Sequence, residues 1–182
     1  MDLRVRPLDA ETWKDFERLA LRYNGVWGGC WCMAFHPEGV GKGHTVEGNR
    51  EAKRRRVLEG KAHASLVYSG EEAVGWCQFG SPDELPRIKM RREYEALAAA
   101  PPAWRITCFF VAPDFRGRGV AAHALDGALG LMKGMGGGLV ESFPQETGEA
   151  RAYTAGGPSK APGSRGERVT WPRQAISIPR VP

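Results

Sequence analysis

The order of apolar and polar positions at the start of the chain predicts one strand and two helices. Residues 3–8 alternate in the manner of a half-buried strand, and Asp9 then offers a helix cap. Apolar residues recur on one helical face up to Gly25, where this helix should end. Thr45 can cap a second helix that runs to about residue 61.

A hairpin and a later helix are predicted next. Residues 63–68 and 73–79 are strand-like runs, and the short polar segment between them is typical of a hairpin connection. Ser81 and Glu84 have the spacing of a capping box. A proline two residues later should interrupt that turn, so we expect a regular helix only at residues 88–97.

A mostly apolar run predicts a central strand. Residues 104–111 are apolar apart from Arg105 and Thr107, as expected for a strand covered on both sides. Helical spacing begins after Gly119 and ends at the glycines of residues 134–138, and residues 139–143 form another strand pattern. The order strand, helix, helix, three strands, helix, strand predicts an α/β (α+β) fold with a mixed sheet flanked by helices.

The chain changes character after Pro144. Residues 145–182 contain five prolines and five glycines without a sustained helical or strand period. Within them, residues 169–171 and 175–178 can form short strands. We therefore expect a domain over residues 1–144 and an atypical C-terminal segment, rich in proline, glycine and arginine, over residues 145–182.

A net charge of +5 and an isoelectric point near 9.2 suit either nucleic acid or a small ligand with several phosphates. Lysine and arginine gather at residues 53–56 and 87–92. We interpret the first cluster as the solvated face of the second helix. Neither cluster has the interleaved aromatic residues of single-strand binders, and no helix-turn-helix signature is visible, so nucleic acid is not an expected partner.

The sequence also bears on membrane spans and on the state of the cysteines. No apolar stretch follows the N-terminal charges, and no later run approaches the ~18 apolar residues that a membrane span needs. We expect a cytoplasmic protein with no membrane partner. In that reducing compartment the four cysteines should be free thiols, and no disulfide is predicted.

The segment from Arg116 to Ala121 combines features that bind an anion with several phosphates. It lies between a predicted buried strand and an amphipathic helix, so backbone N–H groups and the positive helix end point at one place. Gly117 and Gly119 remove side chains where the backbone must approach the ligand, and Arg118 adds a cationic donor. Taken alone, the pattern also fits a tight turn on a basic surface.

These residues carry a resemblance to a known family. Arg116, Gly119 and Ala121 match the signature Arg/Gln-x-x-Gly-x-Gly/Ala of GNAT N-acetyltransferases, and residues 111–113, Val-Ala-Pro, precede it as in that family. The strand order also fits, so the resemblance covers residues 1–143. It implies a GNAT-like, mostly antiparallel mixed sheet and an enzyme that uses acetyl-CoA as its co-substrate.

The resemblance implies roles for particular residues along this segment. The pantetheine arm and the acetyl carbonyl of acetyl-CoA would be held by backbone groups of Phe109, Phe110 and Val111. The pyrophosphate would be bound by the loop and the first helical turn, that is by Arg116, Gly117, Arg118, Gly119, Val120 and Ala121.

Catalysis in this family generally proceeds by direct attack of an amine on the thioester. Glu141, on the strand after the cofactor helix, is the predicted base, directly or through water; alternatively it supports the sheet edge. Tyr153 lies where the family often places a tyrosine that protonates the thiolate. A covalent route through Cys108 is not expected, because no histidine is fixed beside it by the sequence.

The apolar, aromatic segment of residues 25–36 should line a ligand site. Its Cys-Trp-Cys-Met motif, together with residues 74–80, looks like a bacterial GNAT subgroup with poorly defined acceptors. The residues predicted to form the wall of the acceptor pocket are Trp31, Cys32, Phe35 and Gln78. The same cysteines with His36 resemble zinc ligands, but Cys-x-Cys is tighter than the usual knuckle, so no metal is expected.

The predicted function is transfer of an acetyl group to a primary amine of a small molecule or peptide. The alternative is a catalytically weak acyl-CoA-binding or sensing module. It is suggested by residues 145–182, which lack the helix and two strands with which family members normally continue. A divergent end, exchange with another subunit and a reading-frame change in the gene each explain this segment, and a homodimer is compatible with the sequence.

Overall fold

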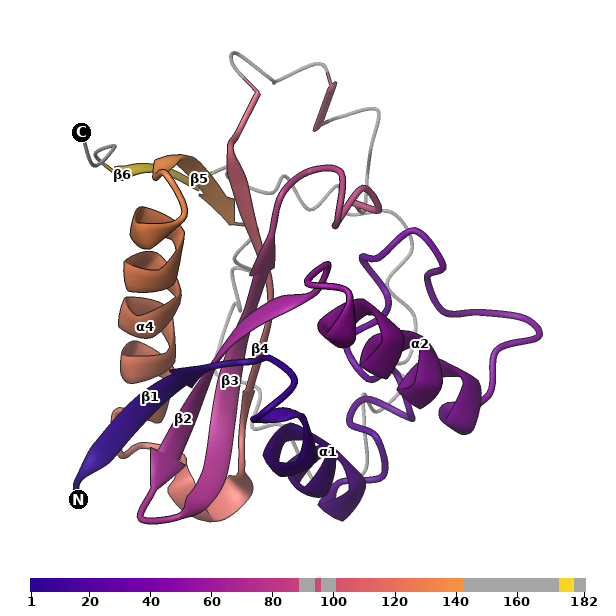
Figure 1. Cartoon of the computed structure of the whole chain (residues 1–182), viewed down its shortest axis with the longest axis vertical. Coiled ribbons are helices and arrows are strands. Elements are labelled where there is room, and N and C mark those ends of the chain that lie inside the picture. The colour runs from indigo at the N-terminus through magenta and orange to yellow at the C-terminus, as the bar shows by residue number, and fades with distance from the viewer. Residues whose placement is uncertain (89–93, 96–100, 143–173, 179–182) are drawn as a thin grey trace, which may run out of the picture.

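The computed structural model describes residues 1–88, 94–95 and 101–142, and the backbone of residues 174–178 (Figure 1). The strands are β1 (Leu3–Pro7), β2 (His63–Ser69), β3 (Glu72–Gly80), β4 (Trp104–Val111), β5 (Gly138–Ser142) and β6 (Gln174–Ile178). The helices are α1 (Trp13–Arg22), α2 (Val46–Leu58) and α4 (Val120–Gly134), with the 3-10 turn η1 (Pro113–Phe115) before α4.

All six strands belong to one sheet. Their order in space is the same as their order along the chain, from β1 to β6. Neighbouring strands are antiparallel except β4 and β5, which are parallel. The predicted mixed, mostly antiparallel sheet is therefore confirmed, and β6 includes the strand predicted at residues 175–178. The strand predicted at residues 169–171 lies outside the described residues.

Local hydrogen bonds explain where the first two helices start. The Oδ1 atom of Asp9 accepts the backbone N–H groups of Glu11 and Thr12, so Asp9 caps the turn before α1, which begins three residues later than a cap at Asp9 predicts. The Oγ1 atom of Thr45 accepts the N–H of Gly48 at 2.9 Å, which confirms the predicted cap of α2.

The capping box predicted after β3 forms, but only a turn follows it. The N–H of Ser81 donates to Oε2 of Glu84 at 2.9 Å, and the N–H of Glu84 donates to Oγ of Ser81 at 3.2 Å. Tyr94 and Glu95 are helical; residues 89–93 and 96–97 of the helix predicted there lie outside the described residues.

The sheet separates two hydrophobic cores. Figure 1 shows α1 and α2 on one face of the sheet and α4 on the other. Because side chains alternate along a strand, Trp76 of β3 packs with α1 while the adjacent Cys77 packs in the core under α4. The first core contains a group of aromatic rings with centroids 4.7–6.4 Å apart, formed by Trp13, Phe16, Trp31, Trp76 and Phe110. These rings fix α1 and the segment after it against the sheet.

One strand is less covered than its sequence predicts. The first three residues of β4 are buried, but Phe109 is 37% exposed although residues 104–111 read as a strand covered on both sides. The prediction of coverage on both faces is therefore wrong at Phe109. Among the described residues, β5 pairs only with residues 104–106, so the second half of β4 lies at an open edge of the sheet.

Close packing of α4 on the sheet depends on a glycine in β3. A Cβ atom at Gly75 would lie 2.7 Å from the carbonyl oxygen of Phe110 and 2.8 Å from Cγ1 of Val120, the first residue of α4. No side chain fits at this position, so the absence of a Cβ lets the start of α4 approach the sheet.

Replacing Gly75 by alanine should lower the free energy of unfolding by about 1–3 kcal/mol, the usual cost of overpacking. Urea denaturation measures it. Gly130→Ala is the matched control, because a Cβ at Gly130 in α4 meets nothing within 4 Å. That control should gain up to about 1 kcal/mol from helix propensity. An unchanged denaturation midpoint for Gly75→Ala would contradict the packing described.

Candidate functional site

An opening lies between β4 and β5. The two strands pair only through residues 104–106 of β4 and residues 140–142 of β5. In the part of the chain that the structure describes, no strand pairs with residues 107–111 on that side of β4. The backbone groups along this edge can therefore bind a ligand instead of a neighbouring strand.

A buried ion pair holds the closed end of this opening. The Nε atom of Arg105 donates to Oε1 of Glu141 at 2.5 Å, and these residues are paired across β4 and β5. Arg105 is 7% exposed and Glu141 is 0% exposed. Arg105 also donates to the carbonyl of Leu85 at 2.9 Å, and the hydroxyl of Tyr94 lies 3.0 and 3.2 Å from the two carboxylate oxygens. Sequence reasoning missed this pairing of Arg105.

A β-bulge lies in β4 directly after its last residue paired with β5. Gln78 of β3 pairs with Cys108, while the next residue, Phe79, pairs with Ile106, so Thr107 is the extra residue of β4. The Nε2 atom of Gln78 donates to Oγ1 of Thr107 at 3.1 Å, which fixes the bulge from the side of β3. Bulges bend a strand and redirect its side chains, and they are common next to active sites.

The three residues predicted to hold the pantetheine arm follow the bulge along β4. Phe109 is half-exposed, Phe110 is 6% exposed and stacks on Trp76, and Val111 is half-buried at the end of β4. The three predicted residues thus share one strand edge, but only the Phe109 side chain is substantially exposed.

The loop between β4 and α4 has the backbone shape predicted for a phosphate site. Gly117 and Gly119 have φ values of 70° and 81°, in the left-handed region that favours glycine. Among the described residues, a Cβ at Gly117 would meet nothing within 4 Å, and one at Gly119 would meet only Nδ1 of His123 at 3.8 Å. The described residues thus leave space at the Cβ positions of both glycines.

The loop leads directly into the 15-residue helix α4. The side chain of Val120 is buried in the core, whereas Ala121 is exposed, so at the first position only the backbone can serve a ligand. The first N–H groups of a helix have no partner within it, and the helix dipole adds positive potential there. This end of α4 is therefore suited to an anion.

Two exposed arginines flank the glycines. The Nε atom of Arg116 donates to the carbonyl of Val111 at 3.3 Å, which links the loop to the end of β4. The Cζ atom of Arg118 lies 5.9 Å from the centre of the Phe115 ring. Both guanidinium groups thus lie at the loop that the sequence assigns to the pyrophosphate.

Of the two predicted catalytic residues, the structure describes only Glu141. Glu141 of β5 pairs with Arg105 of β4, which lies four positions before Phe109. The Glu141 carboxylate contacts Arg105 and Tyr94. Tyr153 lies outside the described residues. The base assigned to Glu141 and the proton donor assigned to Tyr153 stay predictions.

The segment predicted to line the acceptor pocket is tightly packed. Trp31 is fully buried against α1, and its indole N–H has no hydrogen-bond partner among the described residues. Cys32 is 2% exposed and contacts Cys108, and Gln78 is 1% exposed. Phe35 is half-buried. Of these predicted wall residues, Phe35 is therefore the most accessible to a ligand from solvent.

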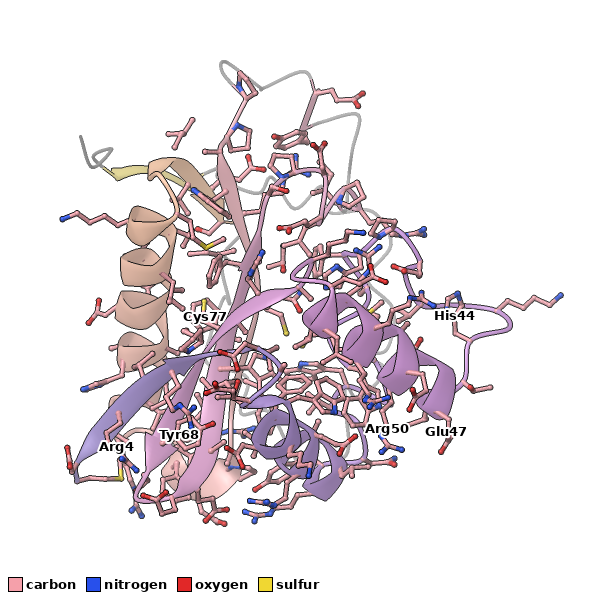
Figure 2. All side chains as sticks on the ribbon, viewed as in Figure 1. Arg4, His44, Glu47, Arg50, Tyr68 and Cys77 are labelled. Carbon is pink, nitrogen blue, oxygen red and sulfur yellow. The ribbon has the colours of Figure 1, made fainter. Side chains whose placement is uncertain are left out.

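A buried lysine on α2 corrects part of the interpretation of residues 53–56 as a solvated face: Arg54 and Arg55 are exposed, but Lys53 is not. Lys53 is 1% exposed, and its Nζ atom donates to Oε1 of Gln78 at 2.5 Å. Asn49, Lys53 and Val57 are the buried residues of α2, at helical spacing. The signal that could have found Lys53 is its place in this stripe, between Asn49 and Val57, where an apolar residue is expected. Figure 2 shows His44 and Glu47 at the end of α2 away from the sheet.

His36 completes a buried polar group with Lys53. The carbonyl of Glu84 lies 3.0 Å from Nδ1 of His36, so this nitrogen carries the proton, and Nε2 accepts from Lys53 Nζ at 3.3 Å. Burial, followed by the nearby charges of Lys53 and Arg56, lowers the pKa of His36 to about 2. Burial also lowers the pKa of Lys53. These groups connect α2 and the segment before it to Gln78, and so to the bulge in β4.

The described residues contain no group of three or more histidine, cysteine, aspartate or glutamate residues placed to hold a metal ion. None of their helices combines the length and the apolar character needed to cross a membrane.

Comparison with protein families identifies the chain. A family model described as Acetyltransferase (GNAT) family matches residues 31–154, which is well over half of the 182 residues. The chain belongs to the GNAT acetyltransferase family. It is an acetyl-CoA-dependent N-acyltransferase, as the motif at residues 116–121 predicts.

Individual relatives are distant. A search of curated proteins found no significant match. Among solved structures, an N-acetyltransferase from Staphylococcus aureus Mu50 is 14% identical, with a TM-score of 0.48 over 82% of this chain and 77% of that one. A PaiA N-acetyltransferase from Thermoplasma acidophilum, in complex with coenzyme A, is 12% identical, with a TM-score of 0.47 over 82% and 83% of the two chains. These identities leave the acceptor unspecified.

Replacing His36 should change how stability depends on pH. Below its ordinary pKa of 6.5 the unfolded chain binds a proton that the folded chain, with a pKa of about 2, does not bind. The free energy of unfolding therefore decreases as the pH falls. Between about pH 7 and about pH 5 the wild type should lose about 2 kcal/mol more than His36→Gln, as measured by urea denaturation.

His44→Gln serves as the control for the loss of an exposed imidazole, and it should keep the pH dependence of the wild type. Equal losses of stability in the wild type and in His36→Gln would show that His36 is not held neutral in the folded protein.

Proposed function

We propose that this enzyme transfers the acetyl group of acetyl-CoA to a primary amine of a small molecule or peptide. One observation carries the proposal: two left-handed glycines bring the backbone to the start of α4, directly beside the open edge of β4. The arrangement combines a site suited to phosphates with an extended strand edge. A nucleotide-linked thioester has a matching phosphate group and a matching extended arm.

The loop before α4 would bind the pyrophosphate. Backbone N–H groups of residues 117–121 and the positive end of α4 supply the main attraction, and the open space over Gly117 and Gly119 supports close approach of the phosphates. Arg116 and Arg118 are exposed and would add charge-assisted hydrogen bonds.

The open edge of β4 would hold the rest of the donor. Acetyl-CoA supplies an acetyl group activated as a thioester. Backbone groups of Phe109, Phe110 and Val111 would bind the pantetheine arm and polarise the acetyl carbonyl, because in the described residues this edge lacks a neighbouring strand. The exposed ring of Phe109 offers the arm an apolar surface.

The acceptor must reach this edge as a neutral amine, because an ammonium ion has no lone pair with which to attack the thioester carbon. We place the acceptor on the side of residues 25–36. There Phe35 would contact it, while the buried Trp31, Cys32 and Gln78 would shape the wall from behind. Tyr153 is proposed to return a proton to the thiolate.

The surroundings of Glu141 support a positioning role more than that of a base. Its carboxylate accepts from Arg105 within a fully buried ion pair, so it is committed to the junction of β4 and β5. We infer that this pair fixes the angle at which β4 leaves β5, and thereby the geometry of the open edge. A carboxylate held as a base would instead need a free path to the acceptor nitrogen.

A second candidate function follows from the same observation. If Glu141 only supports the sheet, and no other group takes its place as base, the protein would bind acyl-CoA with weak turnover, as a sensing module. Consumption of acetyl-CoA in the presence of a panel of primary amines separates the two functions. Binding without release of free coenzyme A for any amine would favour the sensing module.

Replacing Gly119 by valine should weaken the binding of coenzyme A at least about tenfold, because the side chain fills the phosphate site and strains the loop. Isothermal titration calorimetry measures the affinity. Gly60→Val is the matched control: Gly60 also has a left-handed φ and open space around its Cβ position, but it follows α2. Equal affinities for the two variants would refute the assigned loop.

Glu141→Gln should lower the free energy of unfolding by about 3–5 kcal/mol, because Arg105 is left buried without its anion. The double variant Arg105→Met with Glu141→Met should recover at least half of this loss, as urea denaturation measures. Acetyl transfer by the folded double variant then tests the base: a kcat within about tenfold of the wild type would exclude Glu141 as the base.

A further inference from the structure

Two thiols from distant parts of the chain touch beside the open edge of β4. The Sγ atoms of Cys32 and Cys108 are 2.9 Å apart, although the residues are separated by 76 positions in the sequence. Both are free cysteines in the structure. Cys108 lies in β4 between the bulged Thr107 and Phe109, so the pair borders the proposed thioester site.

Buried hydrogen bonds fix the positions of both thiols. The Nε2 atom of Gln78 donates to the carbonyl oxygen of Cys32 and to Oγ1 of Thr107, each at 3.1 Å. The Gln78 side chain, 1% exposed, therefore holds the backbone of Cys32 and the side chain of Thr107, the residue before Cys108. Cys32 also has a φ of 55°, a left-handed conformation that a non-glycine residue adopts only when its surroundings impose it.

The two thiols differ in access to solvent. Cys108 is half-buried and can be reached from solvent, whereas Cys32 is 2% exposed. The hydrogen bond with Cys108, and then burial, raise the pKa of the Cys32 thiol, which keeps it protonated. The other two cysteines have different positions: Cys30 is half-buried in the same segment, and Cys77 is buried in the core under α4. An oxidant from solvent would therefore meet Cys108 before Cys32.

We propose that Cys32 and Cys108 form an oxidation site that reacts with a peroxide and closes to a reversible disulfide. The thiolate sulfur of Cys108 attacks one peroxide oxygen, an S–O bond forms, the O–O bond breaks, and hydroxide leaves. The sulfur of Cys32 then attacks the Cys108 sulfur, an S–S bond forms, and the S–O bond breaks. The departing hydroxide takes the Cys32 proton. Overall, two thiols lose two electrons and two protons, and the peroxide is reduced to water.

Little movement is needed to form this bond. A disulfide holds its sulfurs about 2.05 Å apart, so the two Sγ atoms must approach by a little under about 1 Å. The link would tie the segment of residues 25–36, on the acceptor side, to the strand that holds the donor. A second thiol, such as dithiothreitol or a cellular low-molecular-weight thiol, would attack the disulfide and restore both cysteines.

The test follows the thiols of the full-length Cys30→Ser variant, which leaves Cys32, Cys77 and Cys108. After treatment with hydrogen peroxide and quenching with catalase, the protein is denatured, alkylated with iodoacetamide and digested with trypsin. Mass spectrometry should find the tryptic peptide of residues 23–42 linked to that of residues 106–116, with Cys77 alkylated. Reduction with dithiothreitol before alkylation should restore three alkylated cysteines.

Two controls keep the result interpretable. Adding Cys32→Ser should abolish the linked peptide and leave Cys108 as a sulfenic acid that dimedone traps. The wild type should give the same link with Cys30 alkylated, so the result does not depend on the folding of a variant. If all three thiols of Cys30→Ser remain alkylatable after peroxide, or if Cys108 is overoxidised while Cys32 remains a thiol, the proposal is wrong.

A second readout rests on the proposed function. Acetyl-CoA bound along residues 109–111 would cover the approach to Cys108, so saturating acetyl-CoA should slow formation of the linked peptide at least about fivefold. Gly119→Val should lose this protection, and Gly60→Val should keep it. A disulfide that forms at the same rate with and without acetyl-CoA would leave the oxidation site established and would contradict the assigned donor site.

Discussion

The geometry of the site depends on the length over which β4 and β5 are paired. Three residues of each strand are joined, and the buried pair of Arg105 and Glu141 stands in the middle of that short ladder. Burying two charges costs desolvation energy, which is offset only when the ions meet with good geometry and additional hydrogen bonds, as Leu85 and Tyr94 provide here. The pair thus lies at one junction, and beyond it β4 has no strand partner on this side among the described residues. The loop and α4 follow this edge.

A second constraint acts on β4 from its other side. Gln78 donates to Thr107 at the bulge and to the backbone of Cys32, and it accepts from Lys53. Lys53 in turn donates to the neutral imidazole of His36. A buried polar network of this kind has few alternative arrangements, because each broken contact leaves a donor or acceptor without water. The network thus fixes the bulge, residues 25–36 and α2 relative to one another.

The parts of the molecule that could be predicted from the sequence are those with a local cause. Alternation and helical spacing predicted the strands and helices, Thr45 the cap of α2, and Gly117 and Gly119 the turn before α4. What the sequence did not predict depends on long-range pairing. A lysine within an arginine-rich run reads as solvated until the tertiary structure covers it, and a bulge at Thr107 has no signature in β4 alone. The partner of Arg105 is 36 positions away.

This difference explains why the donor is better defined than the acceptor. The proposed phosphate site consists of backbone N–H groups and a helix end, which a short motif can specify, and the match to the GNAT family model includes that motif. The proposed acceptor side would be assembled from α2, residues 25–36 and the bulged strand, none of which the motif includes. Its specificity would then depend on side chains held by the buried network around Gln78. Cys32 and Cys108 lie between these two parts, so a bond between them would join the proposed acceptor side to the proposed donor side.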